Sequence, residues 1–249
     1  MKKQLHIYSL LFILISFFSG CFQTEHNRET EIKFGVSAEY PPFEFYRHGE
    51  IVGFDIDLAR LIAQNLGKKA LFEDIPFETI LAALSNKDID AGISTITITQ
   101  DRKKMYDCSI PYYKEILALV YKKTEPFKTV NELSHKQVGA QLGTAQQIWL
   151  AKNNPEAEII SMNNNNQLIE ALKAEQINAV IIDLSQADAF CKKNSNLEYF
   201  RIKNSSEPYG VVFEKNSPLT EQVNKIIETL KKEGKIDELI KKWLTTSEG

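Results

Sequence analysis

Apolar residues in this chain form short runs that alternate with longer segments of helical spacing. Runs at residues 32–36, 70–73, 91–93, 116–121, 137–141 and 179–182 predict strands. Apolar residues spaced three and four apart predict helices at 55–66, 77–84, around 148–150, 167–174, 186–192 and, separated by Gly234, 219–243. Asp55 is the expected N-cap of the first helix, and Gly67 lies just beyond its end. This alternation of strand and helix predicts an α/β fold with largely parallel sheets.

The elements divide into two units, and the chain passes between them twice, near residues 113–119 and 206–213. We expect lobe 1 to comprise residues 32–115 and 212–249, and lobe 2 to comprise residues 116–211. The asparagine run at 163–166 is expected to be a loop. Because ligands bind at strand ends in such sheets, the cleft between the lobes is the expected binding site.

The N-terminus has the features of an export signal. Lys2 and Lys3 precede an apolar stretch, residues 7–18, that is too short for a comfortable transmembrane helix. The segment 18–21 (FSGC) resembles a bacterial lipobox, in which cleavage leaves Cys21 as a lipid-modified N-terminus; the alternative is an ordinary signal with an incidental cysteine. We therefore predict a signal peptide at 1–20, a lipid anchor at Cys21 and a polar tether at 21–31. Such a protein lies in the periplasm, or on the outer face of the plasma membrane if the cell lacks an outer membrane.

Charge and composition exclude several classes of function. Loss of the signal removes two lysines and no acid, which lowers the formal net charge from −3 to −5, and an acidic domain argues against a nucleic-acid partner. Cys108 and Cys191 are far apart and suggest neither a disulfide framework nor a zinc site, so we interpret them as small apolar residues. The four histidines are scattered, and no metal or other cofactor is predicted.

The most informative segment is 90–113, DAGISTITITQDRKKMYDCSIPYY. A short apolar strand ends in hydroxyl residues, followed by a single arginine, Arg102; the hydroxyl residues are Ser94, Thr95, Thr97 and Thr99. Hydroxyls and backbone N–H groups beside a planar guanidinium form a suitable site for a small carboxylate. On spacing alone, an edge strand with exposed threonines explains the segment equally well.

Several motifs in combination resemble the polar amino-acid-binding proteins of ABC transporters, the bacterial solute-binding proteins of family 3. The motifs are YPPFEF (40–45), GFDIDLA (53–59), DAGISTITITQDR (90–102), IPYY (110–113), GT (143–144) and KIDELIKKW (235–243). The resemblance covers about residues 32–244. It implies the two-lobed, type II periplasmic-binding-protein-like fold, with two mixed sheets flanked by helices and a ligand cleft between the lobes.

The resemblance also implies roles for individual residues. Arg102 looks like the residue that binds the ligand α-carboxylate, helped by Thr97 and by Thr144 at a helix N-terminus. Asp183 matches the carboxylate of the second lobe that binds the α-ammonium, assisted by Ser94 or Thr95. An amino acid that bridges Arg102 and Asp183 would favour the closed state.

The remaining matched positions surround the ligand side chain. Tyr40 and Phe77 match a pair of rings that enclose it, and Gln146 matches a position that reaches it from lobe 2. Stacking on two rings suits a flat or cationic group. Several relatives that bind basic amino acids carry an acid where this chain has Ser37, although Glu39 is close by. Arginine or lysine is therefore the first expectation, and glutamine or another polar amino acid the second.

The resemblance implies a monomeric, non-enzymatic receptor that delivers an L-amino acid to a membrane permease. Two alternatives remain. The first is a cyclohexadienyl dehydratase, which resembles this family and needs a protonated pocket acid to act on prephenate or arogenate; no such acid is evident from the sequence, and Glu44 is interpreted as structural. The second is a lipoprotein that senses an amino acid without a permease. No catalytic signature motif is found.

Overall fold

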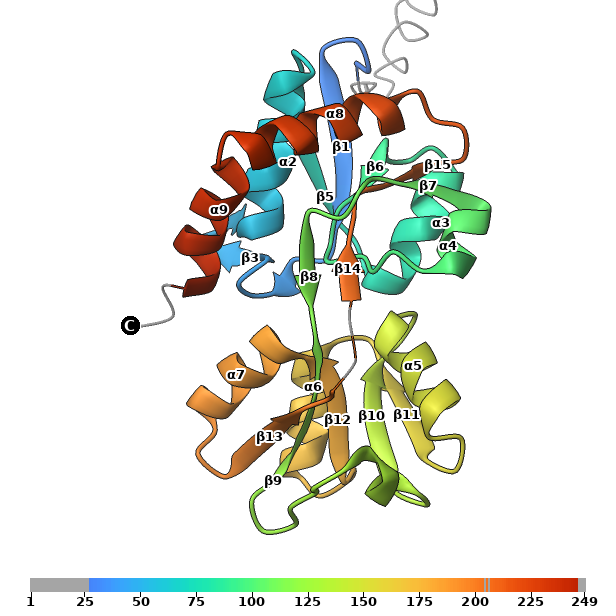
Figure 1. Cartoon of the computed structure of the whole chain (residues 1–249), viewed down its shortest axis with the longest axis vertical. Coiled ribbons are helices and arrows are strands. Elements are labelled where there is room, and N and C mark those ends of the chain that lie inside the picture. Colours follow the sequence, from blue (N-terminus) through green and yellow to red (C-terminus); the bar gives the residue numbers. More distant parts are fainter. Residues whose placement is uncertain (1–26, 204, 206, 246–249) are drawn as a thin grey trace, which may run out of the picture.

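Two five-stranded sheets, one above the other in Figure 1, form the two lobes of the protein. The computed structural model describes residues 27–203, 205 and 207–245. In the first lobe the strand order is β5 (Lys69–Asp74), β1 (Glu31–Val36), β6 (Ala91–Gly92), β15 (Val212–Glu214) and β7 (Tyr106–Cys108). Here β1 is parallel to β5 and β6, whereas β15 is antiparallel to β6 and β7. The sheet is mixed, as expected.

Helices cover both faces of this sheet. On one face the apolar sides of α2 (Phe54–Asn65), α8 (Leu219–Lys232) and α9 (Lys235–Ile240) pack on Phe34 and Val36 of β1. The other face is covered by α3 (Ile80–Ser85), which follows the short η1 (Phe77–Thr79). The chain continues beyond α9 as a π-helical turn, Lys241–Thr245. A sheet buried on both faces explains why the strands appear in the sequence as apolar runs.

The second lobe repeats this plan. Its sheet has the order β11 (Glu158–Met162), β10 (Gln137–Gln141), β12 (Ala179–Asp183), β9 (Leu117–Lys122) and β13 (Leu197–Arg201). Alternate residues of β9 and β12 enter two cores, which lie on opposite faces of the sheet. One core contains α5 (Ala145–Asn153) and η2 (Val130–Leu133), and the other contains α6 (Asn165–Lys173) and α7 (Leu184–Lys193).

Two strands connect the lobes (Figure 1). They are β8 (Tyr113–Glu115) and β14 (Glu207–Tyr209), which pair antiparallel with Tyr113 opposite Tyr209. Both lie where the sequence predicted the crossings. A hydrogen-bonded pair of strands is a suitable hinge, because small backbone rotations at its ends move one lobe relative to the other.

A three-stranded hairpin sheet at the edge of the first lobe was not predicted. It consists of β2 (Glu39–Tyr40), β3 (Glu44–Arg47) and β4 (Glu50–Val52), and α2 begins directly after it. Gly53, the residue before α2, has φ +138°, and a Cβ there would lie 2.0 Å from Phe43 O. Only glycine permits this approach, which lets the N–H groups of Phe54 and Asp55 donate to the carbonyls of Pro42 and Phe43, at 3.1 and 2.9 Å.

Two local predictions were wrong. The N-cap of α2 is Gly53, not Asp55, because the positive φ and the close packing at 53 determine where the helix begins. The asparagine run is not wholly a loop: Asn164 caps α6 by accepting the Gln167 N–H at 2.9 Å, and the helix begins at Asn165. Asparagine favours both loops and N-caps, so its presence alone did not distinguish them.

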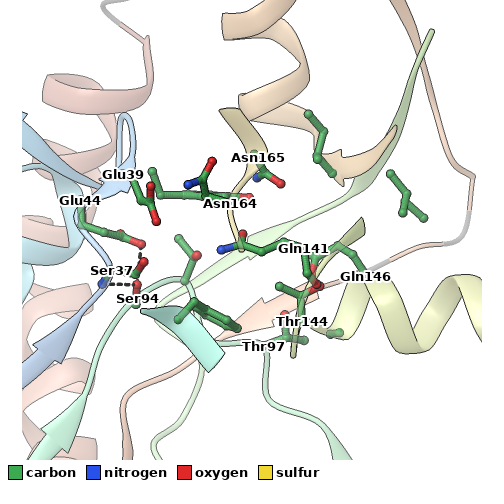
Figure 2. A pocket seen from close by; sticks show the side chains of 16 residues that line it. Ser37, Glu39, Glu44, Ser94, Thr97, Gln141, Thr144, Gln146, Asn164 and Asn165 are labelled. Carbon is green, nitrogen blue, oxygen red and sulfur yellow. Dashed lines mark hydrogen bonds between the residues drawn. The ribbon is translucent and has the colours of Figure 1, made fainter. Parts of the chain in front are cut away.

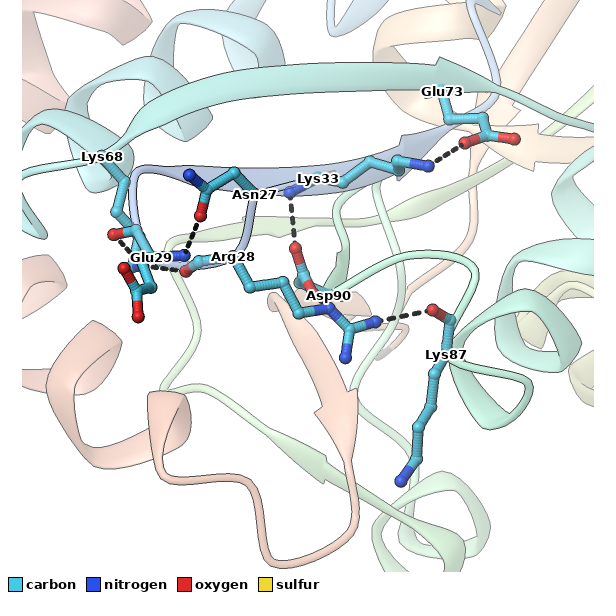
Figure 3. A network of polar contacts seen from close by, with 8 residues as sticks. All are labelled: Asn27, Arg28, Glu29, Lys33, Lys68, Glu73, Lys87 and Asp90. Atoms are coloured by element: carbon cyan, nitrogen blue, oxygen red, sulfur yellow. Dashed lines mark hydrogen bonds and ion pairs between the residues drawn. The ribbon is translucent and has the colours of Figure 1, made fainter. Parts of the chain in front are cut away.

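The first described residues are attached firmly to the first lobe (Figure 3). Arg28 Nε lies 3.0 Å from Asp90 Oδ1, and its Nη2 donates to Lys87 O at 2.7 Å. Asp90 also accepts the backbone N–H of Lys33 at 2.8 Å, and Lys68 Nζ donates to the carbonyl of Glu29 at 2.8 Å. The predicted signal peptide, Cys21 and most of the tether lie outside the described residues.

Candidate functional site

A polar pocket lies between the two lobes (Figure 2). The first lobe contributes Ser37, Glu39, Tyr40, Glu44, Phe77, Ser94, Thr95 and Thr97, and the second contributes Gln141, Thr144, Ala145, Gln146, Asn164, Asn165, Ile181 and Ile182. Figure 2 shows Glu39, Glu44 and Ser94 at one end and Thr97, Thr144 and Gln146 at the other. The pocket therefore has an acidic end and an end rich in hydroxyl and amide groups.

Seven of the nine predicted binding residues line this pocket. They are Tyr40, Phe77, Ser94, Thr95, Thr97, Thr144 and Gln146. The other two, Arg102 and Asp183, are not in its lining, and both make hydrogen bonds between the lobes, as described next. The motifs therefore lie on segments that the fold brings to one cleft, although they did not predict these contacts.

The Arg102 guanidinium spans the cleft at the hydroxyl end. It donates from Nη1 to Thr97 O at 2.8 Å and from Nη2 to Gly143 O in the second lobe at 3.0 Å. Its carbon lies 5.9 Å from the centroid of the Phe77 ring, a cation–π contact. The backbone is fixed by Thr99, the N-cap of α4 (Gln100–Met105), whose hydroxyl accepts the Arg102 N–H at 3.1 Å.

Thr144 is the N-cap of α5, so the positive end of that helix dipole points to the pocket. Its hydroxyl accepts the Gln147 N–H at 3.3 Å and donates to Gln141 O at 2.7 Å. The side chain thus shapes the turn, and the first turn of α5 contributes partial positive charge beside Arg102.

Asp183 lies at the end of β12, is 1 % exposed and accepts hydrogen bonds from three parts of the chain. The donors are the hydroxyl of Tyr40 in the first lobe at 2.6 Å, the hydroxyl of Tyr209 in the connecting strand β14, and Gln146 Nε2 at 2.7 Å. Burial raises the pKa of Asp183, and these three hydrogen bonds oppose the rise. Burial first, and then the charge of Asp183, raise the pKa of Tyr40 and Tyr209 well above the usual value, so both hydroxyls remain donors.

Two pocket acids were not among the predicted binding residues. Glu39 is largely exposed at the pocket edge, and partial burial of its carboxyl group, followed by the charges of Asp74 and Glu78, raises its pKa. Glu44 is 1 % exposed, and its Oε1 accepts the Ser94 hydroxyl at 2.8 Å. Burial first, and then the adjacent Asp55, raise the pKa of Glu44 well above its usual range. Glu44 was interpreted as structural; its place between Phe43 and Phe45 is the signal in the sequence that could have indicated a buried acid.

The described part of the chain contains no cluster of histidine, cysteine and carboxylate groups suited to a metal ion. Within the same residues, no helix has the length and apolar character needed to cross a membrane. Cys108 and Cys191 are free thiols, and burial raises the pKa of both. The chemistry of the site is therefore that of its acids, amides, hydroxyls, rings and one guanidinium.

Two α/β lobes, joined by two strands around a polar cleft, define the class of two-lobed periplasmic binding proteins. The chain belongs to the bacterial extracellular solute-binding proteins, family 3, whose profile matches residues 32–246. This membership confirms the family and fold that the motifs indicated.

The names of the relatives state different amino-acid ligands. The chain is 33 % identical to the arginine-binding extracellular protein ArtP of Bacillus subtilis, over 85 % of each chain. It is 34 % identical to the L-cystine-binding protein TcyJ of Escherichia coli K12, over 84 % of this chain and 80 % of the relative. Among solved structures, the arginine-, lysine-, histidine-binding protein ArtJ of Geobacillus stearothermophilus has a TM-score of 0.83 and 32 % identity, over 87 % of this chain and 96 % of that one. These relatives are solute-binding proteins.

Proposed function

We propose that this protein captures an L-amino acid with a cationic side chain, arginine or lysine, by closure of its two lobes and delivers it to an ABC-transporter permease without chemical change. The observation that carries the proposal is the separation of charge in the pocket. Glu39 and Glu44 lie at one end, and Arg102 lies beside the other. A basic amino acid has a carboxylate at one end and a cation at the other, which matches this arrangement.

The α-carboxylate of the ligand binds at the Arg102 end. A guanidinium offers a planar fork of N–H donors that fits a carboxylate in two parallel hydrogen bonds. Arg102 Nη2 donates across the cleft to the Gly143 carbonyl, and the ligand carboxylate would accept from this group on binding. Thr97 and the first turn of α5 supply further donors.

The α-ammonium of the ligand binds Asp183. Its two oxygens offer about four acceptor positions, and Tyr40, Tyr209 and Gln146 use three of them. One ammonium N–H can therefore bind without displacing any of these donors. Because Tyr40 and Asp183 belong to different lobes, the ligand adds to a contact that already favours closure.

The cationic end of the ligand lies between Tyr40 and Phe77 and faces the two acids. Serine at position 37 removes one acid found in several relatives that bind basic amino acids, and Glu39 and Glu44 replace its charge from neighbouring positions. This arrangement supports arginine or lysine over glutamine, because a side-chain cation gains an ion pair with these acids and a neutral side chain does not.

We propose further that the protein is a monomer held at a membrane surface through a lipid on Cys21, in the periplasm or outside the plasma membrane. Arg28 is attached to Asp90 of the first lobe. The six residue-to-residue steps from Cys21 to Asn27 span at most about 20 Å, so the first lobe would remain close to the membrane in which the permease lies.

A thermal-shift screen of the purified protein against the common L-amino acids, with prephenate and arogenate added, tests the proposal. A ligand that binds only the native state raises the melting temperature by mass action. We expect the largest rise with arginine or lysine. A rise only with neutral amino acids would contradict the cationic ligand, and turnover of prephenate or arogenate would overturn the receptor function.

Arg102→Ala tests the carboxylate end. We expect at least a 100-fold loss of arginine affinity by calorimetry, since a charge-assisted pair is removed. Lys103→Ala in the same helix is the matched control, because it removes an exposed positive charge and should leave affinity unchanged. Equal affinity in the two variants would refute the role of Arg102.

A further inference from the structure

Asp55 is a fully buried carboxyl group that does not line the pocket. It lies in the first turn of α2, with an exposed fraction of 0 %. Its Oδ2 accepts the backbone N–H of Thr95 at 2.7 Å and the hydroxyl of Tyr112 at 2.8 Å. The proposed ligand contacts make no use of this side chain, so its burial needs another explanation.

The carboxyl group of Asp55 lies beside that of the pocket acid Glu44, since two consecutive residues donate one to each acid, Ser94 to Glu44 and Thr95 to Asp55. The two are held together by the backbone: Phe54 and Asp55 donate to the carbonyls of Pro42 and Phe43, and Gly53 makes this approach possible. Within the described residues, Glu44 Oε2 and Asp55 Oδ1 accept no hydrogen bond from any amide or hydroxyl group, and both atoms are buried. Two carboxyl groups in such contact cannot both be ionised at low cost, so the pair holds one proton between them.

The donors around the pair place that proton on Glu44. Asp55 has two donors for its charge, the Thr95 N–H and the Tyr112 hydroxyl, whereas Glu44 has only the Ser94 hydroxyl. Burial raises the pKa of Asp55 to about 7, and burial together with the adjacent Asp55 raises the pKa of Glu44 well above its usual range. The other ionisable groups that face the pair are Asp183, across the pocket, and the neutral phenols Tyr40 and Tyr112. Asp183 is the charged group among these, and its negative charge favours retention of the proton.

We propose, on the basis of the cationic ligand proposed above, that Asp55 keeps Glu44 protonated in the empty pocket and that the side-chain cation of the ligand displaces this proton into solvent. Asp55 is then a positioning residue that acts through Glu44. Before binding, the pair carries one negative charge. After binding it carries two, and the ligand cation balances the second. One proton leaves for each cationic ligand that binds, and no proton leaves for a neutral one.

This exchange gives specificity that side-chain shape alone does not. A protonated Glu44 is a neutral donor and acceptor, so the empty pocket avoids an unpaired buried charge. A neutral ligand contacts the protonated, uncharged Glu44 and gains no ion pair, whereas a cationic ligand gains an ion pair with Glu44 after the proton has left. Linkage then requires that affinity for a cationic ligand rises with pH, by up to about tenfold per pH unit for one released proton, until the empty pair itself ionises.

Calorimetry in buffers of different ionisation enthalpy counts the released protons directly. Arginine is titrated into the wild-type protein at pH 7.5, where Asp55 is ionised, in phosphate, imidazole and Tris, and citrulline serves as the uncharged ligand of nearly the same shape. We expect close to one proton released with arginine and none with citrulline. Arginine binding whose heat is independent of the buffer would overturn the inference but leave the proposed function intact. Absence of arginine binding in every buffer would overturn both.

Asp55→Asn separates this role from a purely structural one. The amide oxygen can still accept from Thr95 and Tyr112, and the amide N–H₂ can donate to an ionised Glu44. We expect this variant to bind arginine with no proton release and with an affinity independent of pH between 5.5 and 7.5. Proton release equal to that of wild type would overturn the role of Asp55. Asp57→Asn, which alters the partly exposed acid two residues further along α2, should behave as wild type. The buffer series on the wild-type chain decides the question even if Asp55→Asn folds poorly.

Discussion

Glu44 and Asp183 are two carboxyl groups buried to the same extent on opposite sides of one cleft, yet their surroundings differ. Each is 1 % exposed. Asp183 accepts three hydrogen bonds, from Tyr40, Tyr209 and Gln146, whereas Glu44 accepts one from Ser94 and faces a second acid, Asp55. Donors stabilise the ionised form and a neighbouring carboxyl group disfavours it. Burial alone therefore does not determine whether a pocket acid is charged.

The two acids also differ in whether they connect the lobes. Asp183 connects the second lobe to Tyr40 of the first, and Gln186 of α7 likewise donates to Pro41 O across the cleft. The Glu44–Asp55 pair lies entirely within the first lobe. We therefore expect changes at Asp183 to alter closure and ligand binding together. Changes at the pair should alter the pH dependence and ligand selectivity.

The largest expected effect is on the backbone that holds the acid pair together. Gly53→Ala introduces a Cβ that would lie 2.0 Å from Phe43 O at a φ of +138°, and we expect a loss of about 3 kcal/mol or more in the free energy of unfolding. Gly49→Ala is the matched control, because Gly49 has φ +84° and open space around it; it should cost about 1 kcal/mol. Urea unfolding measures both, and equal losses would mean that the contact at Gly53 is unimportant.

The next effect concerns the carboxylate between the lobes. Asp183→Asn keeps the shape of the side chain but removes its charge, and we expect arginine affinity to fall by about 2 kcal/mol, roughly 30-fold, as the α-ammonium loses its partner. Asp188→Asn removes the same charge from a partly exposed position in α7 and should change affinity little. Calorimetry on the two variants compares them. Similar affinities would show that the ammonium is bound elsewhere.

A smaller effect distinguishes the two pocket acids. Glu44→Gln should weaken the binding of arginine about tenfold, or roughly 1.4 kcal/mol, because the buried ion pair is lost. The loss is no larger because dehydrating the two charges offsets part of the energy of the pair. Citrulline affinity should stay the same. Glu39→Gln should have a weaker effect on arginine, since Glu39 is exposed and its charge is screened by water. A larger loss with Glu39→Gln than with Glu44→Gln would reverse this assignment.

The smallest expected effect is on the stability of the empty protein. The folded pair holds a proton that the unfolded chain gives up near the ordinary carboxyl pKa of about 4, so stability falls as pH rises from there towards about 7. The raised pKa values of Glu115 and Asp183 act in the same direction. One proton contributes at most about 1.4 kcal/mol per pH unit. Calorimetric melting should show a lower melting temperature at pH 7 than at pH 5.5, and a smaller difference in Asp55→Asn; an equal difference would argue against the shared proton.

Much of the fold followed from local patterns. The strand Gln137–Gln141 was predicted at its observed bounds, and the two crossings lie where apolar strands pass between the units. The hairpin from β2 to β4 was missed because its strands are short and Pro41 and Pro42 suggest only a turn. Asp55 was interpreted as a helix cap because aspartate often has that role. Its actual neighbours, Thr95 and Tyr112, are 40 and 57 residues away.

The sequence by itself determined the alternation of strands and helices, the motifs of the family and the segments that form the pocket, because each of these depends on neighbours within a few residues. Only the tertiary structure decided which side chains face one another. Tyr40 and Asp183 are 143 residues apart, and the contact between Glu44 and Asp55 depends on the conformation of a single glycine. The charge of a buried acid depends on the donors that surround it in space. Local spacing does not specify them, and so the acidic end of the pocket became evident only in the folded protein.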